Sequence, residues 1–468
     1  MTLPVTLTLA DREQMQLMAH LFPGDGKESA AIGLCTLGAS ENPVRILVKE
    51  IIPVPIEICT VRTSVAIQWP FEWLDPLLSR AAAAGLSIVK FHCHPGNQDF
   101  FSKTDDERDD AFFENLHGYL DNDLPHASVI VMPSGQMLGR VGLPDSTQHA
   151  IAQIGIAGRQ PQFWWRSTAP DDSPINGAVG RHSRGFGQEM RSELKRLSVG
   201  VVGVSGTGSI VAEQLARLGI GRIVLVDPQR VEARNLDRIL NATAIDARDG
   251  IHKVVVVKRA IDALGFGTKV IDIPSSIMER DAVIALASCD ILFGCVDGAE
   301  GRAILDRLVS TQLQPLVDVG VGAVADDDGG IDQIDTAVNF VVPGGSSLLS
   351  RGVYTPEQVH AESLARVAPE EHARQRAEKY IKGRHEEQPA VISINMIAAA
   401  SAVLELIARL YPYRHNPNLD EFDAVRINLA EVEFTTDKYN LPCPVMGKLL
   451  AIGGREPLLN MPQLSRKN

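Results

Sequence analysis

The sequence is poor in cysteine and in positive charge, and each shortage excludes a class of protein. Six cysteines are spread over 468 residues without a Cys-x-x-Cys pair, so we expect no disulfide framework and a reducing compartment. Lysine and arginine total 45 against 58 acidic residues, a net charge of −13. That balance argues against a large nucleic-acid footprint, which needs clustered basic residues. The first residues lack a basic stretch followed by an apolar core, so we expect no signal peptide.

Long hydrophobic runs are also scarce. The most apolar one, residues 391–410, is interrupted by polar side chains that include Ser393, Asn395, Glu405 and Arg409. We therefore expect a buried helix and no membrane span. With 45% hydrophobic and 22% charged residues, the composition is that of a soluble globular protein, and the cytoplasm is the expected location.

The chain predicts two α/β domains. Apolar runs that alternate with helical patterns, among them a helix expected at residues 70–84, cover residues 1–150, which we assign to a first domain. Residues 151–180 are rich in Pro, Gly, Ser and Asp and form the expected linker. A second α/β domain is expected over residues 181–450, with a mainly helical final part, and a tail over residues 451–468 follows it. In the second domain a central strand, a Gly-rich turn, a helix and the next strand form a βαβ unit.

The first domain carries a pattern of potential metal ligands. His92 and His94 are two residues apart on an expected strand, so their side chains share a face. Ser102 and Asp105 share a face if a helix starts there, and Asp105 can supply a third ligand. Three protein ligands and a water form a catalytic zinc site. Taken singly, His-x-His also arises by chance, and Ser102 with an acidic first turn is also an ordinary helix N-terminus.

The joint pattern, His-x-His-Pro-x6-Ser-x-x-Asp with an upstream Glu, resembles the JAMM (JAB/MPN) metalloproteases over about residues 5–145. The resemblance implies an α/β metalloprotease fold with Zn²⁺ held by His92, His94 and Asp105. Ser102 would support the tetrahedral intermediate. The general base of the family lies before an early small-residue strand, which favours Glu28 over Glu50.

The second domain carries a glycine-rich turn. Gly203, Gly206 and Gly208 open a helix whose N–H groups can hold phosphates, although Ser205 replaces one glycine of a Gly-x-Gly-x-x-Gly pattern. Asp227 ends the next strand, where an acidic residue can hold a ribose. These residues alone suit an NAD-dependent oxidoreductase equally well.

Four further residues favour an enzyme that binds a triphosphate over an NAD-dependent oxidoreductase. Asn235, Arg238, Lys253 and Asp297 follow at spacings that suit a triphosphate and Mg²⁺. Together with the turn they resemble the ThiF/MoeB family and the adenylation domain of ubiquitin-activating enzymes, over about residues 178–410. The resemblance implies a Rossmann-like fold that binds ATP and Mg²⁺. Asp227 would hold the ribose, Asn235, Arg238 and Lys253 the phosphates, and Asp297 the magnesium.

The resemblance also bears on assembly and on cysteine chemistry. Arg184 matches an arginine that acts on the ATP of a neighbouring subunit, which implies a homodimer formed through the second domain. Ser347, Ser350 and Met446 stand where a structural zinc site of the family would have cysteines, so we predict no zinc there. Gln229 also replaces an acidic residue. Either the acyl-adenylate is the final product, which we favour, or Cys443 forms a thioester.

These patterns predict a bifunctional enzyme that acts on a ubiquitin-like protein ending in glycine. The first domain would process or remove that protein, and the second would adenylate its terminal glycine. The arrangement resembles bacterial ubiquitin-like conjugation systems, some of them linked to phage defence, and a conjugating-enzyme-like partner is possible. Two alternatives stay open: activation of a sulfur carrier for cofactor synthesis, and a protease fused to a non-catalytic nucleotide sensor.

Overall fold

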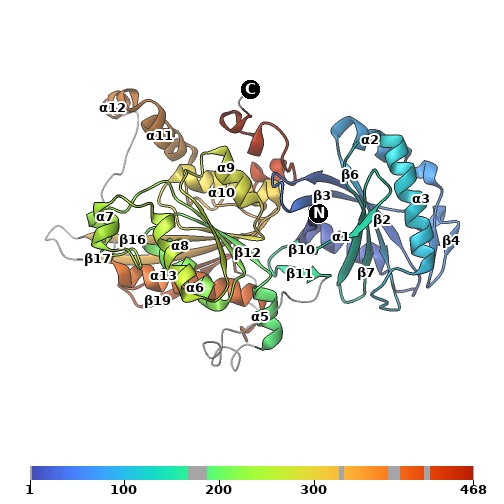
Figure 1. The fold of residues 1–468 in the computed structure, drawn as a ribbon, viewed down its shortest axis with the longest axis horizontal. Coiled ribbons are helices and arrows are strands. Elements are labelled where there is room, and N and C mark those ends of the chain that lie inside the picture. Colours follow the sequence, from blue (N-terminus) through green and yellow to red (C-terminus); the bar gives the residue numbers. More distant parts are fainter. Residues whose placement is uncertain (1–2, 167–186, 326–330, 378–390, 416–421, 467–468) are drawn as a thin grey trace. The chain divides into compact units, whose positions relative to one another are not determined.

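A computed structural model describes residues 3–166, 187–325, 331–377, 391–415 and 422–466, and the chain divides into two compact units (Figure 1). The first unit holds residues 1–168 together with residues 311–313 and 449–460. The second unit holds the rest of the chain. The first part of the expected C-terminal tail, up to Asn460, therefore belongs to the first unit, far from it in sequence.

The first unit is built on a nine-stranded mixed sheet with the order β11-β10-β1-β3-β2-β6-β7-β8-β9. Its strands are β1 (Val5–Ala10), β2 (Ala30–Leu37), β3 (Val44–Pro53), β6 (Ser87–Cys93), β7 (His126–Val131), β8 (Met137–Gly142), β9 (Gln148–Ala150), β10 (Gln153–Ala157) and β11 (Gln162–Trp165). A separate two-stranded ribbon joins β4 (Val61–Arg62) to β5 (Ile67–Gln68).

Helices cover both faces of this sheet, because its central strands are buried on both sides. Residues Val89, Phe91 and Cys93 of β6 belong to a core that includes Leu17 and Leu21 of α1 (Asp11–Leu21). The alternate residues of β6 face α2 (Asp75–Ala84) and α3 (Lys103–Leu120), which lie together in Figure 1. Strand alternation therefore directs Lys90 and His92 toward α3.

Two sequence expectations for this unit need correction. The expected helix at residues 70–84 starts with a 3-10 turn, Phe71–Leu74, and only then becomes α2. The expected linker at residues 151–180 begins with β10 and β11, which extend the sheet beside β1. The alternating buried Ile154 and Ile156 outweigh the Pro- and Gly-rich composition of the segment.

The second unit is built on an eight-stranded sheet with the order β14-β13-β12-β15-β16-β17-β18-β19, parallel from β14 to β16 and antiparallel beyond. Its strands are β12 (Ser198–Val202), β13 (Arg222–Val226), β14 (Lys269–Ile273), β15 (Ile291–Gly294), β16 (Leu316–Ala325), β17 (Ile331–Val341), β18 (Ala424–Asn428) and β19 (Glu433–Asp437). The part expected to be mainly helical thus adds β18 and β19 to the sheet.

The strand order places a functional crevice in this unit. The chain runs from β12 outward through β13 to β14 and then returns to β15 on the other side of β12. In open α/β sheets, ligands bind at the carboxyl ends of strands where the order reverses in this way. The Rossmann-like expectation for the second part of the chain is therefore confirmed by the topology.

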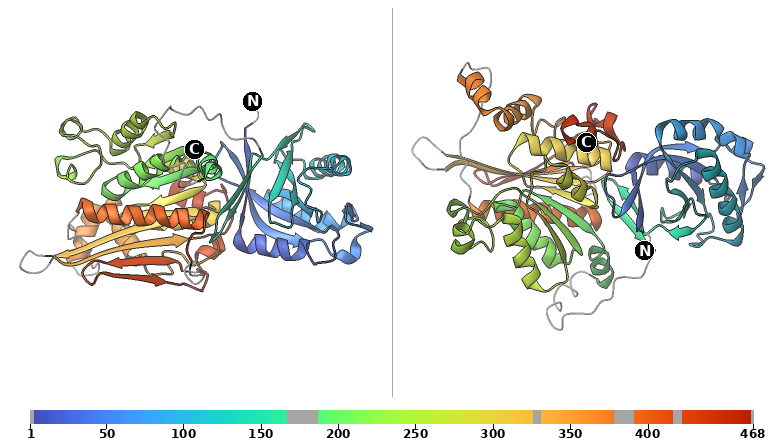
Figure 2. Two further views of the ribbon diagram at one scale, coloured as in Figure 1. Left: turned by 90° about the horizontal axis from the view of Figure 1, so that it is seen from below. Right: turned by 45° about the horizontal axis from the view of Figure 1, so that its top comes forward.

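The helices described in the second unit are α5 (Gln188–Leu194), α6 (Gly206–Leu218), α7 (Ala244–Arg248), α8 (Lys253–Leu264), α9 (Arg280–Ala287), α10 (Ala299–Gln312), α11 (Pro356–Val367), α12 (Pro369–Ala377) and α13 (Ile392–Leu410). Most of them pack against the sheet, whereas α11 and α12 contact each other and extend away from it (Figure 1). Among the described residues, α13 is the one helix long and apolar enough to cross a membrane, but 61% of it is buried. It lies along the sheet (Figure 2), as expected for a core helix.

Candidate functional sites

Three potential metal ligands converge in the first unit, where β6 ends beside the start of α3. The Nε2 atoms of His92 and His94 lie 3.2 Å apart. The carboxylate of Asp105 lies 3.3 Å from Nε2 of His92 and 3.5 Å from Nε2 of His94. All three residues are buried. The structure therefore brings together the three residues that the sequence pattern selected.

This geometry suits zinc. Ligand atoms about 2.0–2.1 Å from a tetrahedral zinc ion lie roughly 3.3 Å from one another, close to the three separations observed. Nδ1 of His94 lies 2.9 Å from the carbonyl oxygen of Gln98. Because a carbonyl can only accept, Nδ1 of His94 carries the proton and its Nε2 is left free for a metal. Two neutral imidazoles and one carboxylate also match the donor set of a catalytic zinc site.

Ser102 is the N-cap of α3. Its Oγ accepts a hydrogen bond from the backbone N–H of Asp105 at 3.2 Å and donates one to Oδ2 of Asp105 at 2.7 Å. Burial opposes the charged carboxylate, but the close contacts with His92 and His94 and the hydrogen bonds from Ser102 hold the pKa of Asp105 below its usual value. Ser102 thus orients a metal ligand as well as capping the helix.

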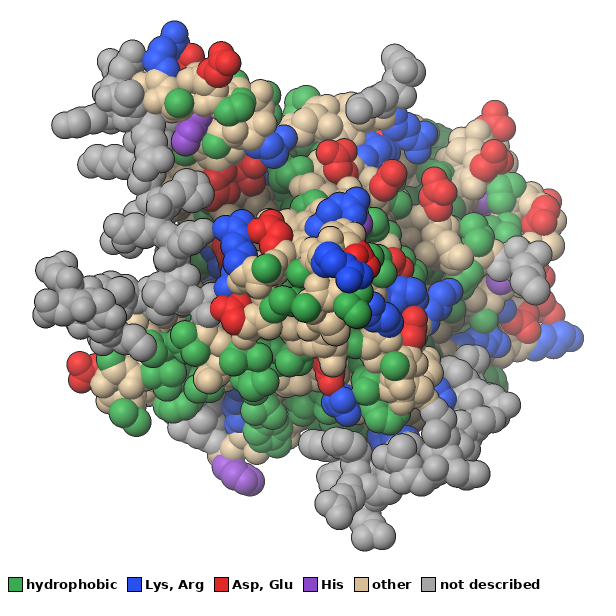
Figure 3. Space-filling view, turned by 60° about the vertical axis from the view of Figure 1, so that its left-hand side comes forward, with side chains coloured by type: hydrophobic (Ala, Val, Ile, Leu, Met, Phe, Trp, Pro, Cys, Tyr) green, Lys and Arg blue, Asp and Glu red, His purple; other side chains and the backbone are tan. Residues whose placement is uncertain are grey.

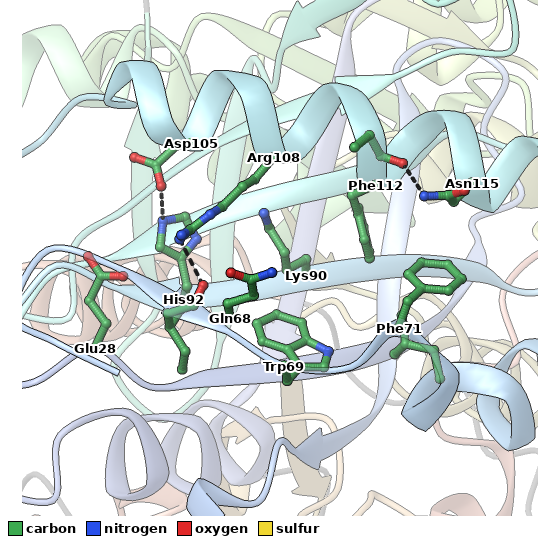
Figure 4. A pocket seen from close by; sticks show the side chains of 13 residues that line it. Glu28, Gln68, Trp69, Phe71, Lys90, His92, Asp105, Arg108, Phe112 and Asn115 are labelled. Atoms are coloured by element: carbon green, nitrogen blue, oxygen red, sulfur yellow. Dashed lines mark hydrogen bonds and ion pairs between the residues drawn. The ribbon is translucent and has the colours of Figure 1, made fainter. Parts of the chain in front are cut away.

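Glu28 lies just before β2, in the wall of the cavity that also includes His92 and Asp105 (Figure 4). The residue is 3% exposed, and burial raises the pKa of its carboxyl to about 7. A carboxylate with that pKa is well matched to accept a proton at neutral pH. Glu50, the other acid considered, instead pairs with Arg80 at the surface.

A buried charge network, which no sequence motif singled out, lies next to the site. Asp109, fully buried on α3, pairs with Lys90 of β6 and with Arg140 of β8, whose Nε lies 2.6 Å from Oδ2 of Asp109. Asp109 follows Asp105 by one helical turn, and Lys90 shares the face of His92. These two spacings were the available signals for the network, which fastens α3 to the sheet beneath the metal ligands.

In the second unit, the glycine-rich turn links β12 to α6. Gly203 has φ of +84°, a conformation that favours glycine, and a Cβ atom there would meet the carbonyl oxygen of Cys295 at 2.4 Å. A Cβ on Gly208 would lie 1.8 Å from the carbonyl oxygen of Gly203. The turn therefore packs closely against the end of β15, and the first N–H groups of α6 face the crevice where phosphates bind in such folds.

Lys253, the first residue of α8, reaches the same turn. Its side chain is buried, and Nζ donates to Oε1 of Gln229 at 2.6 Å and to Oγ of Ser205 at 3.2 Å. Burial lowers the pKa of Lys253, and the nearby Arg238 adds to that effect. Ser205 and Gln229, which depart from the family pattern in the sequence, thus hold the lysine through neutral oxygens.

Three other expected nucleotide residues follow β13 in the chain. Asp227 accepts hydrogen bonds from the backbone N–H groups of Val204 at 2.7 Å and Gln229 at 2.8 Å, so it shapes the turn. Asn235 is buried and accepts the N–H of Glu232. Arg238 is partly exposed beside Asp237.

Asp297 follows β15 and is exposed, close enough to Lys253 to affect its pKa. Asn395 of α13, which no sequence motif singled out, also contacts the glycine-rich turn. Its Oδ1 accepts a hydrogen bond from Thr207 at 3.3 Å.

Two further expectations concern residues elsewhere. Arg184 lies outside the described residues. Cys443 is 2% exposed, and its Sγ accepts the N–H of Met446 at 3.5 Å. A nucleophilic cysteine needs access to its substrate, so this burial favours the alternative in which no thioester forms.

Comparison with known proteins assigns the second part of the chain. The ThiF family matches residues 179–445. The chain is 26% identical over 163 residues to ubiquitin-like modifier-activating enzyme 5 of Bombyx mori, covering 33% of this chain and 39% of that protein. It is 32% identical over 143 residues to the sulfur carrier protein adenylyltransferase of Thermus thermophilus, covering 31% and 51% respectively.

Among solved structures, the chain is similar to E. coli MccB with ATP, at 20% identity and a TM-score of 0.42, over 59% of this chain and 75% of that one. The matches to the two curated relatives named above cover 39% and 51% of the length of those proteins. The family match does not cover residues 1–178. It therefore gives no support to the resemblance between the first unit and the metalloproteases. Through residues 179–445, the chain belongs to the ThiF family.

Proposed function

We propose that this protein is a bifunctional enzyme of a ubiquitin-like system. Its second unit adenylates the C-terminal glycine of a small ubiquitin-like protein with ATP, and its first unit is a zinc-dependent peptidase that cuts beside that glycine. The single observation that carries the peptidase is the convergence of His92, His94 and Asp105 at mutual distances of 3.2–3.5 Å, with Glu28 in the adjoining cavity.

Membership of the ThiF family supports the adenylation reaction. The N–H groups of α6 and the cations of Lys253 and Arg238 stabilise the triphosphate charge as the terminal carboxylate attacks the α-phosphate and pyrophosphate leaves. Asp227 holds the ribose, Asn235 contacts the phosphates, and Asp297 holds the Mg²⁺ that accompanies ATP. Because Lys253 is bound by neutral oxygens, its charge is not cancelled before ATP arrives.

In the first unit, a zinc ion held by His92, His94 and Asp105 would lower the pKa of a bound water to about 7. Glu28 would accept a proton from that water and pass it to the leaving amine. The hydroxyl of Ser102, fixed beside Asp105, would stabilise the developing negative charge. Peptide cleavage and adenylation therefore both take place at the same terminal glycine.

The names of the relatives favour two partner classes, ubiquitin-like modifiers and sulfur carriers. Joining activation to a peptidase in one chain favours the first, because a protease can expose or detach a conjugated tail. A conjugating-enzyme-like protein would then accept the activated tail. The nucleotide-sensing alternative predicts ATP binding without turnover.

We also propose that the second unit forms a homodimer in the cytoplasm. Exposed apolar residues Met396, Ile397 and Leu404 lie along the outer side of α13, and Phe434 is 71% exposed on β19. Hydrophobic side chains gather on the face that Figure 3 presents. Surfaces of this kind are typical of protein interfaces. Sedimentation of the full chain tests this, and a strictly monomeric species at micromolar concentration would contradict it.

Two measurements test the enzyme activities. ATP–pyrophosphate exchange should depend on a small partner protein that ends in glycine, and no exchange with any such partner would refute adenylation. Metal analysis of purified protein should give one zinc per chain, and Asp105→Ala should lose it. Undiminished zinc in that variant would show that the ligand set is wrong.

A further inference from the structure

The candidate zinc site opens into an apolar cavity that the proposed reaction does not yet use. The cavity encloses about 180 Å³. Figure 4 shows it between α3, β6 and the segment that carries Trp69 and Phe71, with Glu28, His92 and Asp105 at one end. Its apolar walls are contributed by Ile67, Trp69, Phe71, Leu74, Ala111 and Phe112.

The walls of the cavity are held in place. Nη1 of Arg108 donates a hydrogen bond to the carbonyl oxygen of Ile67 at 2.8 Å, which ties the 67–71 segment to α3. Lys90, although it lines the cavity, is paired with the buried Asp109. Phe112 and Leu74 are buried in the core on which Trp69 and Phe71 pack. The cavity is therefore a preformed site, as is usual for small-ligand pockets.

We propose that this cavity binds a bulky apolar side chain of the residue that follows the scissile glycine. The inference rests on the proposed function, in which the tail ends in glycine. Glycine has no side chain, so the residue on the amino side of the cut cannot fill a pocket next to the metal ligands. The residue on the leaving side can, and about 180 Å³ is enough for a phenylalanine or leucine side chain.

This assignment selects one class of substrate. A precursor with an apolar residue after its glycine fills the cavity, whereas an isopeptide-linked lysine offers only an unbranched stem. Hydrolysis breaks the bond between the glycine carbonyl carbon and the next nitrogen. The water oxygen joins the glycine as its carboxylate, and the apolar residue leaves with a free amine that takes the proton from Glu28. The first unit is therefore a maturation peptidase.

The test uses the zinc-loaded full chain and four matched substrates. Three peptides share one tail ending in glycine, followed by phenylalanine, leucine or alanine, and the fourth joins the same tail to the ε-amine of lysine. We expect kcat/KM for phenylalanine and leucine to exceed that for alanine and for the isopeptide by about 10- to 100-fold, the effect of burying one large side chain. Equal rates, or faster cleavage of the isopeptide, would overturn the proposal.

A variant and its control locate the effect. Ala111→Phe places a ring in the cavity from an exposed position of α3, and Ala83→Phe makes the same change at an exposed position of α2 outside it. Ala111→Phe should reduce the preference for phenylalanine over alanine to below about threefold, and Ala83→Phe should leave it unchanged. An unchanged preference in Ala111→Phe would show that the selectivity arises elsewhere.

Peptide affinities measured without cleavage distinguish a failure of the cavity assignment from a failure of the proposed peptidase. Labelled Gly–Phe and Gly–Ala peptides are titrated into Glu28→Gln, which retains the cavity, and fluorescence anisotropy gives their affinities. Tenfold tighter binding of the Gly–Phe peptide without cleavage by the wild type would support the cavity assignment and refute the peptidase. Equal binding together with equal cleavage would support the peptidase and refute the cavity assignment.

Discussion

Replacing Glu28 by glutamine should strongly reduce peptide cleavage while the zinc content stays at one per chain. Glutamine keeps the shape of the side chain but cannot accept a proton from the nucleophilic water. General base catalysis is commonly worth 10²–10⁴-fold, so kcat/KM should fall by about that factor. Glu50→Gln is the matched control, because Glu50 lies on the neighbouring β3 but pairs with Arg80 at the surface.

The pH dependence follows from the same residue. Burial raises the pKa of Glu28 to about 7 in the metal-free protein, and a nearby zinc ion would lower it. Only the ionised form acts as a base, so kcat/KM of the wild type should fall about tenfold per pH unit below an apparent pKa at or under 7. The residual activity of Glu28→Gln should lack this step.

The stability of the metal-free protein should change in the opposite direction to the activity. A carboxyl whose pKa is raised on folding stabilises the native state fully below its unfolded pKa, and this contribution is lost as pH rises through about 7. Glu28→Gln should therefore unfold at higher denaturant concentration than the wild type at pH 8, by roughly 2–3 kcal/mol, with water at the cavity mouth reducing the full value. At pH 5 the difference should largely vanish.

Two results would refute this reasoning. Cleavage by Glu28→Gln within tenfold of the wild type would show that Glu28 is not the base. A comparable loss in Glu50→Gln would show that the assay reports general disruption. Zinc analysis on both variants is needed to attribute any loss to proton transfer.

Three further predictions concern the buried ionisable side chains of Lys253, Asp109 and Asp306. Gln229→Glu should place a negative charge against Lys253 and lower ATP–pyrophosphate exchange about tenfold, mainly through a higher KM for ATP, whereas an unchanged KM would argue against the contact. Asp109→Asn should destabilise the first unit by about 3–5 kcal/mol in chemical unfolding, because it leaves Lys90 buried without its carboxylate, and a loss under 1 kcal/mol would contradict this. Burial raises the pKa of Asp306 to about 6, so the stability of the wild type relative to Asp306→Asn should fall by about 2 kcal/mol between pH 4 and pH 7, and a flat difference would show that this carboxyl titrates normally.

Local sequence patterns predicted the elements that hold the sites. The alternation of β6 indicated that His92 and His94 share a face, and the Gly-rich turn after β12 indicated a helix that starts at a ligand crevice. Composition predicts a linker from residue 151, but the alternating Ile154 and Ile156 form β10 there. The pattern after Pro70 predicts one helix, although the first turn of this segment is 3-10.

Contacts distant in the sequence were beyond such patterns. Nothing local shows that Asn395 of α13 meets the phosphate turn, or that Gln229 binds Lys253. These contacts form only when separate elements pack on one sheet. The family resemblance supplied residue roles for Asp227 and Asp297, but it could not show that Asp227 also bonds the backbone of the turn.

By itself, the sequence determined the kind of chemistry, because residue type and spacing fix which side chains lie on one face of a strand or one turn of a helix. It placed a pair of imidazoles, a carboxylate one loop later and an upstream glutamate in the first part of the chain, and a phosphate-binding turn in the second. Only the tertiary structure decided that α3 folds back over β6, which brings Asp105 to 3.3 Å from His92. Packing of that helix against the 67–74 segment also creates the apolar cavity, which no periodicity encodes because its walls come from three separate elements.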